Sequence, residues 1–302
     1  MKRFLRSRRI RRLGFALGLL VVLWLLSSLL MVYWLTSRPH ARFDEPVPAV
    51  AWGRLEPQRL LTADGLGIGA WFAAGPDNGP SILLLHGNRG SRRNSLSNAA
   101  VFAEEGCSVL LLSLRAHGDS DGEQNDLGYS ARQDVAAAVE FLERRRPGRP
   151  IVIQGTSLGA AAAIFAGPEL GTRVTGYVLE SPYRDLRTAA RNRLQAYLPP
   201  LLDEIAYAGA KLVCPLILPD VDRIAPVESL GKIPPTIPIL ILAGSIDNRA
   251  LPEEARDLHE RVASHGRLVF FEGAGHHSLR GHNPTLYREK VRQLLRAVVQ
   301  GR

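Results

Sequence analysis

The sequence IVIQGTSLGA, residues 151–160, joins two kinds of structure across a few residues. Residues 151–153 are typical of a short buried strand, and the alanines at 160–163 are typical of a helix. Between them Ser157 stands in the pattern G-x-S-x-G. This pattern is typical of a sharp strand-to-helix turn that exposes a serine hydroxyl, although an ordinary turn serine fits it equally well. The surrounding sequence has to decide between these two interpretations.

Apolar runs that are predicted to be strands alternate with predicted helices along the chain. The predicted strands are residues 81–87, 108–114, 150–155, 174–181, 237–244 and 267–273. The predicted helices include residues 131–145, 253–264 and 285–299. Most of the strands are continuously apolar, as expected when helices cover both faces of a sheet. The alternation therefore predicts an α/β domain with a mainly parallel sheet, and places Ser157 at the carboxyl end of a strand, where such sheets bind ligands.

The N-terminal segment differs from the rest of the chain. Residues 1–12 contain seven Lys and Arg residues and no acid, and residues 13–35 are 23 residues without a charge. At about 1.5 Å per residue the apolar segment forms a helix about 34 Å long, which is enough to cross a bilayer. A cleaved secretory signal is the alternative, but its apolar region is usually shorter, and no convincing cleavage site follows Leu35. We therefore expect a retained transmembrane helix.

The distribution of charge argues against a nucleic-acid partner and indicates an orientation. The formal net charge is +9, but 38 basic residues less the seven N-terminal ones leave 31 against 29 acidic residues, or +2. A nearly balanced body does not favour binding to phosphate backbones. The seven charges before the apolar segment outnumber Arg38 and Arg42 just after it. The positive-inside tendency therefore predicts a membrane protein with a single span, a cytoplasmic N-terminus and an extracytoplasmic body.

Composition divides the chain into parts with different expected roles. We expect a basic cytoplasmic N-terminus, a transmembrane helix, a proline-rich linker and one folded domain, in the ranges 1–12, 13–35, 36–59 and 60–302. Residues 183–235 interrupt the alternation of strands and helices with several prolines, and we expect them to form a lid over the carboxyl edge of the sheet. Cys107 and Cys214 are too few for a disulfide framework and lack metal-ligand spacing. An exported location permits one disulfide between them, but we expect two unrelated buried thiols.

Two further residues complete the set that a serine nucleophile requires. A serine hydroxyl needs a general base, and the base needs an acid that orients it. Asp247 follows the predicted strand 237–244, and His276 follows the predicted strand 267–273. A lone aspartate or histidine in a loop is usually a surface residue. Three candidates in the order Ser, Asp, His, each after a strand, favour Ser157 as a nucleophile.

An acyl-transfer reaction also needs backbone N–H groups that stabilise the developing oxyanion. The N–H of Leu158, directly after the serine, is one candidate. The N–H of Asn88, in the loop after the predicted strand 81–87, is the other. The glycines around Asn88 are also explained by an ordinary turn.

Six motifs in this order resemble those of the α/β-hydrolases, particularly the serine-aminopeptidase-like and lysophospholipase-like branch. They are LLLHGNRGS (83–91), RAHGDSDG (115–122), GTSLGAAAA (155–163), LESPYRDL (179–186), PILILAGSIDNRALP (238–252) and FEGAGHHSL (271–279). The resemblance covers roughly residues 60–300. It implies the α/β-hydrolase fold and an acyl-enzyme mechanism without a metal or organic cofactor. It also implies that Ser157 is the nucleophile, Asp247 the orienting acid and His276 the general base. The implied oxyanion N–H donors are those of Leu158 and Asn88.

Three details of these motifs carry separate expectations. Ala116 stands where the family has glycine, which predicts an altered turn. Arg89, Arg92 and Arg93 follow the oxyanion loop. They favour an anionic group near the entrance of the site, although surface arginines are more often merely solvated. The family pattern ends on His276, so this residue, and not the adjacent histidine, is the expected base.

The substrate is less well specified than the reaction, because this fold serves esters, amides and thioesters. Apolar residues of the lid segment, such as Leu194 and Leu201, fit an acyl pocket and equally fit a seal between lid and core. We expect a membrane-anchored serine hydrolase that cleaves a small-molecule ester, with a lipid-derived ester within its reach. A serine peptidase of the same fold and a non-catalytic, membrane-tethered binding protein on a hydrolase scaffold are the alternatives.

Overall fold

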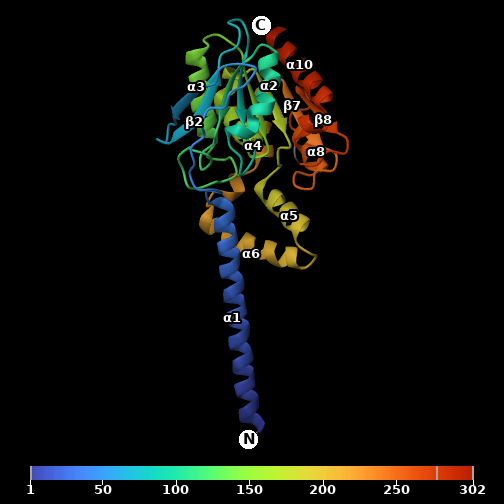
Figure 1. Ribbon diagram of the computed structural model, residues 1–302. Coiled ribbons are helices and arrows are strands. Elements are labelled where there is room, and N and C mark those ends of the chain that lie inside the picture. The colour runs from blue at the N-terminus through green and yellow to red at the C-terminus, as the bar shows by residue number, and fades with distance from the viewer. Residues whose placement is uncertain (1, 277, 301–302) are drawn as a thin grey trace.

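The computed structural model describes residues 2–276 and 278–300, with the backbone alone for residues 2–10. A long helix, α1 (Lys2–Thr36), extends from a rounded body that holds the sheet (Figure 1). Within the described residues the sheet has eight strands in the order β1-β2-β4-β3-β5-β6-β7-β8. These are β1 (Glu56–Leu61), β2 (Gly67–Ala73), β3 (Ser81–Leu85), β4 (Ser108–Leu112), β5 (Ile151–Thr156), β6 (Gly176–Glu180), β7 (Ile239–Gly244) and β8 (Gly266–Phe271).

The six strands β3 to β8 run parallel and confirm the predicted sheet. Strands β1 and β2 pair antiparallel at one edge and were not predicted. Strand β1 alternates between partly buried and exposed residues and carries Pro57, so it has no continuous apolar run. It also begins at Glu56, inside the segment that the composition assigned to a linker. Strand β2 contains two glycines, which weaken its strand signal.

Helices cover both faces of the sheet, because successive side chains of a strand point to opposite faces. Leu83 belongs to the core on one face, and Leu84 belongs to the core on the other. The first face is covered by α3 (Arg132–Arg145), α4 (Leu158–Leu170), α7 (Pro226–Leu230) and α8 (Pro252–Glu260). The second is covered by α2 (Leu96–Glu104), α9 (Leu279–His282) and α10 (Pro284–Gln300). This arrangement leaves the carboxyl edge of the parallel strands for loops.

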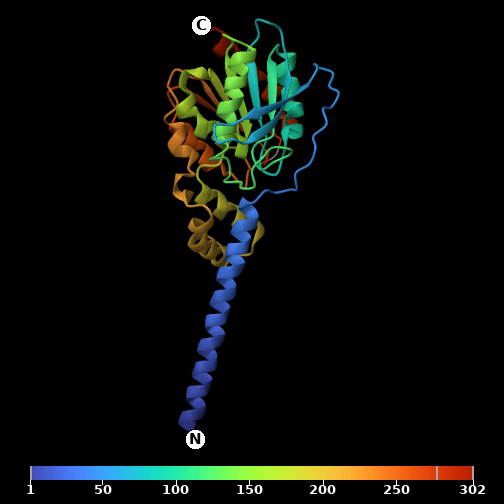
Figure 2. The same ribbon diagram turned by 90° about the vertical axis from the view of Figure 1, so that its left-hand side faces the viewer.

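The segment predicted to be a lid contains two helices that project from the body beside α1, namely α5 (Leu186–Tyr197) and α6 (Leu202–Ile217) (Figure 2). Helix α6 packs directly on α1. The indole Nε1 of Trp24 donates to the carbonyl of Ile205 over 3.1 Å. Gly209 lies so close to Ser28 that no side chain fits between the two helices.

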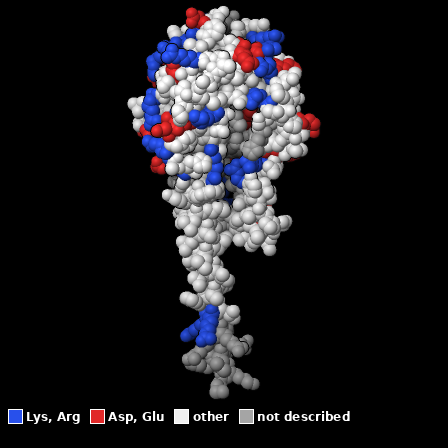
Figure 3. All heavy atoms as spheres, in the orientation of Figure 1, with Lys and Arg blue, Asp and Glu red and all other residues white. Residues whose placement is uncertain are grey.

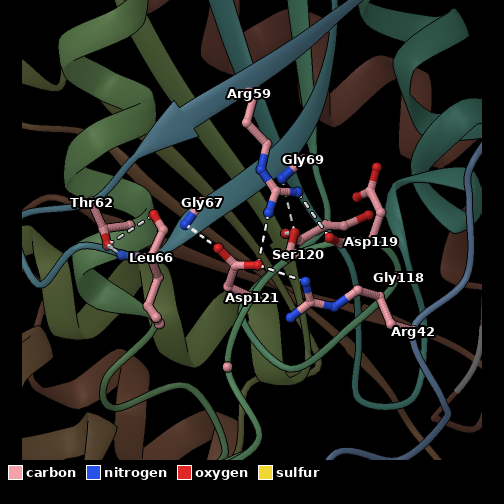
Figure 4. Close-up of polar contacts among 12 residues, drawn as sticks. Arg42, Arg59, Thr62, Leu66, Gly67, Gly69, Gly118, Asp119, Ser120 and Asp121 are labelled. Atoms are coloured by element: carbon pink, nitrogen blue, oxygen red, sulfur yellow. Dashed lines mark hydrogen bonds and ion pairs between the residues drawn. The ribbon is translucent and has the colours of Figure 1, made fainter.

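The segment predicted to be a linker lies along the body. Arg42 and Arg59 both pair with the Asp121 carboxylate, at 2.9 and 2.8 Å (Figure 4). The other oxygen of Asp121 accepts from the N–H of Gly67 at 2.7 Å. One carboxylate thus fastens the proline-rich segment to strands β1 and β2.

The sequence carries separate expectations for Ala116 and for the two cysteines. Ala116 adopts a left-handed φ of 60° and donates to the carbonyl of Asp121 over 2.8 Å. The tight turn that favours glycine is therefore made by alanine, at a cost of about 1 kcal/mol. Cys107 is buried in the core as expected, whereas Cys214 on α6 is only half-buried, and both are free thiols in this structure.

Candidate active site

Ser157 occupies a strained turn between β5 and α4. Its φ of 52° and ψ of −108° lie outside the regions that serine normally adopts. A Cβ on Gly155 would lie 2.5 Å from the backbone of Gly159, and a Cβ on Gly159 would lie 2.5 Å from the carbonyl oxygen of Leu85. The two glycines of G-x-S-x-G are therefore required by the close approach of β5, α4 and β3. The N–H of the serine donates to the carbonyl of Glu180 over 2.8 Å, which holds the turn against β6.

Ser157, His276 and Asp247 form a hydrogen-bonded chain. His276 Nε2 lies 3.1 Å from Ser157 Oγ, and His276 Nδ1 lies 2.8 Å from Asp247 Oδ2. Each residue follows a parallel strand, so all three meet at one edge of the sheet although 119 positions separate the serine from the histidine. With Nδ1–H donated to the carboxylate, Nε2 carries no proton and can accept a hydrogen bond from the serine hydroxyl. The adjacent residue, His277, lies outside the described residues.

The environment of Asp247 favours the ionised form of its carboxyl group. Its side chain is buried, and its Oδ1 accepts from the N–H groups of Arg249 and Ala250 at 2.9 and 3.0 Å. Burial by itself raises the pKa of Asp247, but the hydrogen bond and charge of His276 and these two N–H groups outweigh it, so the pKa lies below its ordinary value. A buried carboxylate of this kind orients the imidazole and stabilises an imidazolium.

Both candidate oxyanion donors line the pocket that contains the serine and the histidine. Leu158 is the first residue of α4, so its N–H has no acceptor within the helix. The Asn88 loop is fixed from two sides. Asn88 Oδ1 accepts from Asn125 Nδ2 at 2.9 Å, and His117 Nε2 accepts from the Arg89 N–H at 3.3 Å. Burial lowers the pKa of His117 to about 4, which keeps its imidazole neutral and able to accept.

The pocket also contains two arginines that the sequence did not single out. Arg193 from α5 and Arg249 from the loop after β7 both line it. Arg249 lies in the motif that contains Asp247, which is a signal that could have identified it. Arg193 carries no such signal, because only the packing of α5 turns it toward the pocket.

Two of the three arginines that were expected near the entrance point elsewhere. Arg92 is buried and pairs with Asp119 at 2.7 Å and with Glu45 at 3.6 Å. Arg93 donates to the carbonyl of Pro46 over 3.1 Å. Both therefore attach the proline-rich segment and neighbouring loop to the body, and the expectation is wrong for these two residues.

A buried carboxyl group, that of Glu180, lies under the serine turn and was also missed. Its Oε1 accepts from Gln154 Nε2 at 2.8 Å, from Asn98 Nδ2 at 3.0 Å and from Tyr287 Oη at 2.5 Å. Burial raises the pKa of Glu180 to about 7, although these hydrogen bonds oppose the rise. The only hint in the sequence is an acid at the end of an otherwise apolar strand.

Comparison with known proteins places this geometry in context. The lysophosphatidylserine lipase ABHD12 of Gallus gallus is 29% identical over 180 residues, which are 55% of this chain and 44% of that protein. The uncharacterized membrane protein YNL320W of Saccharomyces cerevisiae is 24% identical over 239 residues, covering 78% of this chain and 76% of the relative. The solved structure of the Pyrococcus furiosus esterase Pf2001 superposes with a TM-score of 0.67 at 22% identity, covering 85% of this chain and 98% of the esterase.

The extent of the family match settles the classification. The model of the Alpha/beta hydrolase family matches residues 82–289, which is more than half of the chain. The matched region begins in β3 and ends in α10, so it includes the serine turn and the loops that carry the acid and the histidine. The chain therefore belongs to the alpha/beta hydrolase family.

Proposed function

We propose that this protein is a membrane-anchored serine hydrolase that cleaves an ester through an acyl-enzyme on Ser157. The observation that carries the proposal is the hydrogen-bonded chain from Asp247 through His276 to Ser157. His276 Nε2 takes the hydroxyl proton as Oγ attacks the ester carbonyl, and the N–H groups of Leu158 and Asn88 stabilise the oxyanion. The imidazolium then returns the proton to the leaving alcohol. Water, activated by the same nitrogen, releases the acid and restores the serine.

The lid helices support a lipid-derived substrate. Helix α6 packs on α1 near Trp24 and Ser28. These residues lie about 10–16 Å along the helix before Leu35, the end of the apolar segment. If α1 spans a bilayer, α6 lies within the hydrocarbon layer. Apart from the exposed Glu204 and Lys211, its surface suits this place, because it and the preceding turn expose large apolar side chains: Leu201, Leu202, Ile205, Leu212 and Leu216. The pocket is lined in part by α5, the neighbour of α6, so it lies where a substrate can reach it from the membrane.

The relatives point the same way. One is named a lysophosphatidylserine lipase and another a membrane protein. The apolar part of α1, Arg11–Thr36, is long enough to cross a membrane, and most of it is unburied. We infer a single span with the N-terminus in the cytoplasm and the catalytic domain outside. Protease added to intact cells, or to spheroplasts where an outer membrane exists, should digest the domain. Complete protection by membranes that are verified as sealed contradicts this orientation.

The catalytic proposal is tested with the purified full chain in detergent micelles. A fluorophosphonate probe should label wild type on Ser157, and the protein should hydrolyse p-nitrophenyl esters. Ser157→Ala should lose the label and several orders of magnitude in turnover. Ser264→Ala, which changes an exposed serine in the loop before β8, is the matched control and should keep both. A folded wild type that neither labels nor hydrolyses any activated ester favours the tethered binding protein. Faster turnover of aminopeptidase substrates than of esters favours the peptidase.

A further inference from the structure

Three arginines at or beside the candidate active site have no acidic partner among the described residues. They are Arg193 on α5, Arg249 after β7 and Arg89 in the loop after β3. In the described part of the chain no carboxylate oxygen lies within 4.0 Å of their guanidinium nitrogens. Other arginines of the body, such as Arg92 and Arg115, are paired with carboxylates. The three cations at the mouth therefore form a local excess of positive charge.

The structure fixes the Arg249 guanidinium and ties its segment to the helix that carries Arg193. Asn192, the neighbour of Arg193 on α5, donates to the carbonyl of Arg249 over 3.2 Å and so ties the two arginine-bearing segments together. The guanidinium of Arg249 donates to the hydroxyl of Tyr197 and lies 5.7 Å from the centre of its ring. Arg193 is partly buried. Burial, and then the like charges of Arg249 and Arg89, lower its pKa, as expected of cations that face one another without a counter-charge.

The third arginine connects this group to the membrane helix. The guanidinium carbon of Arg89 lies 4.2 Å from the ring centre of Trp34, at the outer end of the apolar segment of α1. Tryptophan at such a position favours the level of the lipid headgroups. Figure 3 shows Lys and Arg side chains gathered at the base of the body, directly above the mostly uncharged neck formed by α1 and the lid. The arginine group therefore lies where lipid phosphates would be found.

We propose that Arg193 and Arg249 bind a phosphate group on the substrate, with Arg89 at the mouth, so that the preferred substrates are acyl esters whose alcohol carries a phosphate. The inference rests on the proposed function and adds the substrate class. A phosphate has several oxygens in a tetrahedral arrangement, so it accepts from guanidinium groups on two different elements at once. A neutral ester would leave these cations without a counter-charge. Acylglycerol phosphates of the membrane and soluble phosphorylated esters share this chemistry.

The first experiment measures kcat/KM for an acylglycerol 3-phosphate and for the monoacylglycerol with the same acyl chain. Both are presented in nonionic micelles at the same mole fraction. Wild type should favour the phosphorylated ester at least tenfold, and Arg193→Gln should lower this ratio about 10- to 100-fold. Arg193→Lys should restore part of it, because the charge returns without the planar fork. The control, Arg191→Gln, removes from the same helix an exposed charge that is paired with Glu204 of α6, and it should leave the ratio unchanged. A wild-type ratio of one or less, or a ratio that Arg193→Gln does not move, overturns the inference.

The second experiment separates this inference from the proposed function by measuring binding without turnover. Ser157→Ala protein is titrated calorimetrically with an alkylglycerol 3-phosphate, an ether that is not an ester, and with the matching alkylglycerol. Preferential binding of the phosphate, weakened in the double variant with Arg249→Gln, supports the inference even if wild type hydrolyses nothing. Equal binding of the two ethers overturns it even if the esterase is active. A short-chain phosphate ether that binds as tightly as the long-chain one supports phosphate recognition and overturns the lipid source.

Discussion

Glu180 should make the protein lose stability as the pH rises toward neutrality. Burial raises the pKa of its carboxyl group from 4.5 to about 7. Between these two pH values the folded chain retains a proton that the unfolded chain has released, so the free energy of unfolding falls as the pH rises. Below pH 4.5 both states are protonated and the group has no effect. Above pH 7 both are ionised, and the loss amounts to about 3 kcal/mol.

Replacement of Glu180 by glutamine tests this reasoning. The amide keeps an oxygen that can accept from Gln154, Asn98 and Tyr287, and it cannot ionise. As the pH rises from 4.5 to 8, the free energy of unfolding of Glu180→Gln should therefore increase relative to that of wild type by about 1–3 kcal/mol. This corresponds to roughly several degrees in Tm for a domain of this size. The extra amide protons of the variant can carry a cost that does not depend on pH. Such a cost shifts the variant's curve relative to wild type by the same amount at every pH, so only a difference that grows with pH is diagnostic.

The assay is the Tm of the full chain in nonionic micelles, recorded at intervals from pH 4.5 to 9. Glu140→Gln is the matched control, because its carboxyl is exposed on α3 and pairs with Arg144 at the surface. This control should follow wild type at every pH. Curves for Glu180→Gln and wild type that stay parallel across the whole range would refute the buried, protonated carboxyl.

Two further substitutions test the site and its turn. Asp247→Asn should reduce esterase turnover about 10⁴-fold, because an amide cannot hold His276 in the required tautomer; turnover within tenfold of wild type would contradict this role. Gly159→Ala places a Cβ 2.5 Å from the carbonyl oxygen of Leu85. It should cost about 1–3 kcal/mol or more, lowering the Tm and abolishing fluorophosphonate labelling. Gly231→Ala, whose new Cβ meets its nearest neighbour at 3.7 Å, should melt and label like wild type.

Much of the fold and the membership of the site followed from local patterns. The six parallel strands are continuous apolar runs because both faces of the sheet are covered, and a run of that kind is visible without knowing its neighbours. The carboxyl ends of parallel strands share one edge, so a Ser, an Asp and a His that each follow a strand are brought together by topology alone. The two glycines beside Ser157 record a close backbone approach that no other residue permits.

Tertiary structure alone decided the features that depend on residues distant in the sequence. Strands β1 and β2 exist because β4 offers an edge to pair with. Strand β1 has no continuous apolar run and β2 contains two glycines, so their own residues did not predict them. Arg92 was expected at the site entrance, yet it is buried against Asp119, while Arg193 reaches the pocket because α5 packs over it.

The charge state of Glu180 and the packing of α6 on α1 have the same origin. The pKa of Glu180 is raised because several elements together remove water from its carboxyl group. The position of α6 depends on its contact with α1. The sequence by itself therefore determined the fold class, the order of the candidate catalytic residues and the apolar N-terminal helix. Each depends on the order and spacing of residues along the chain. The environment of each side chain is set by neighbours that only folding brings near.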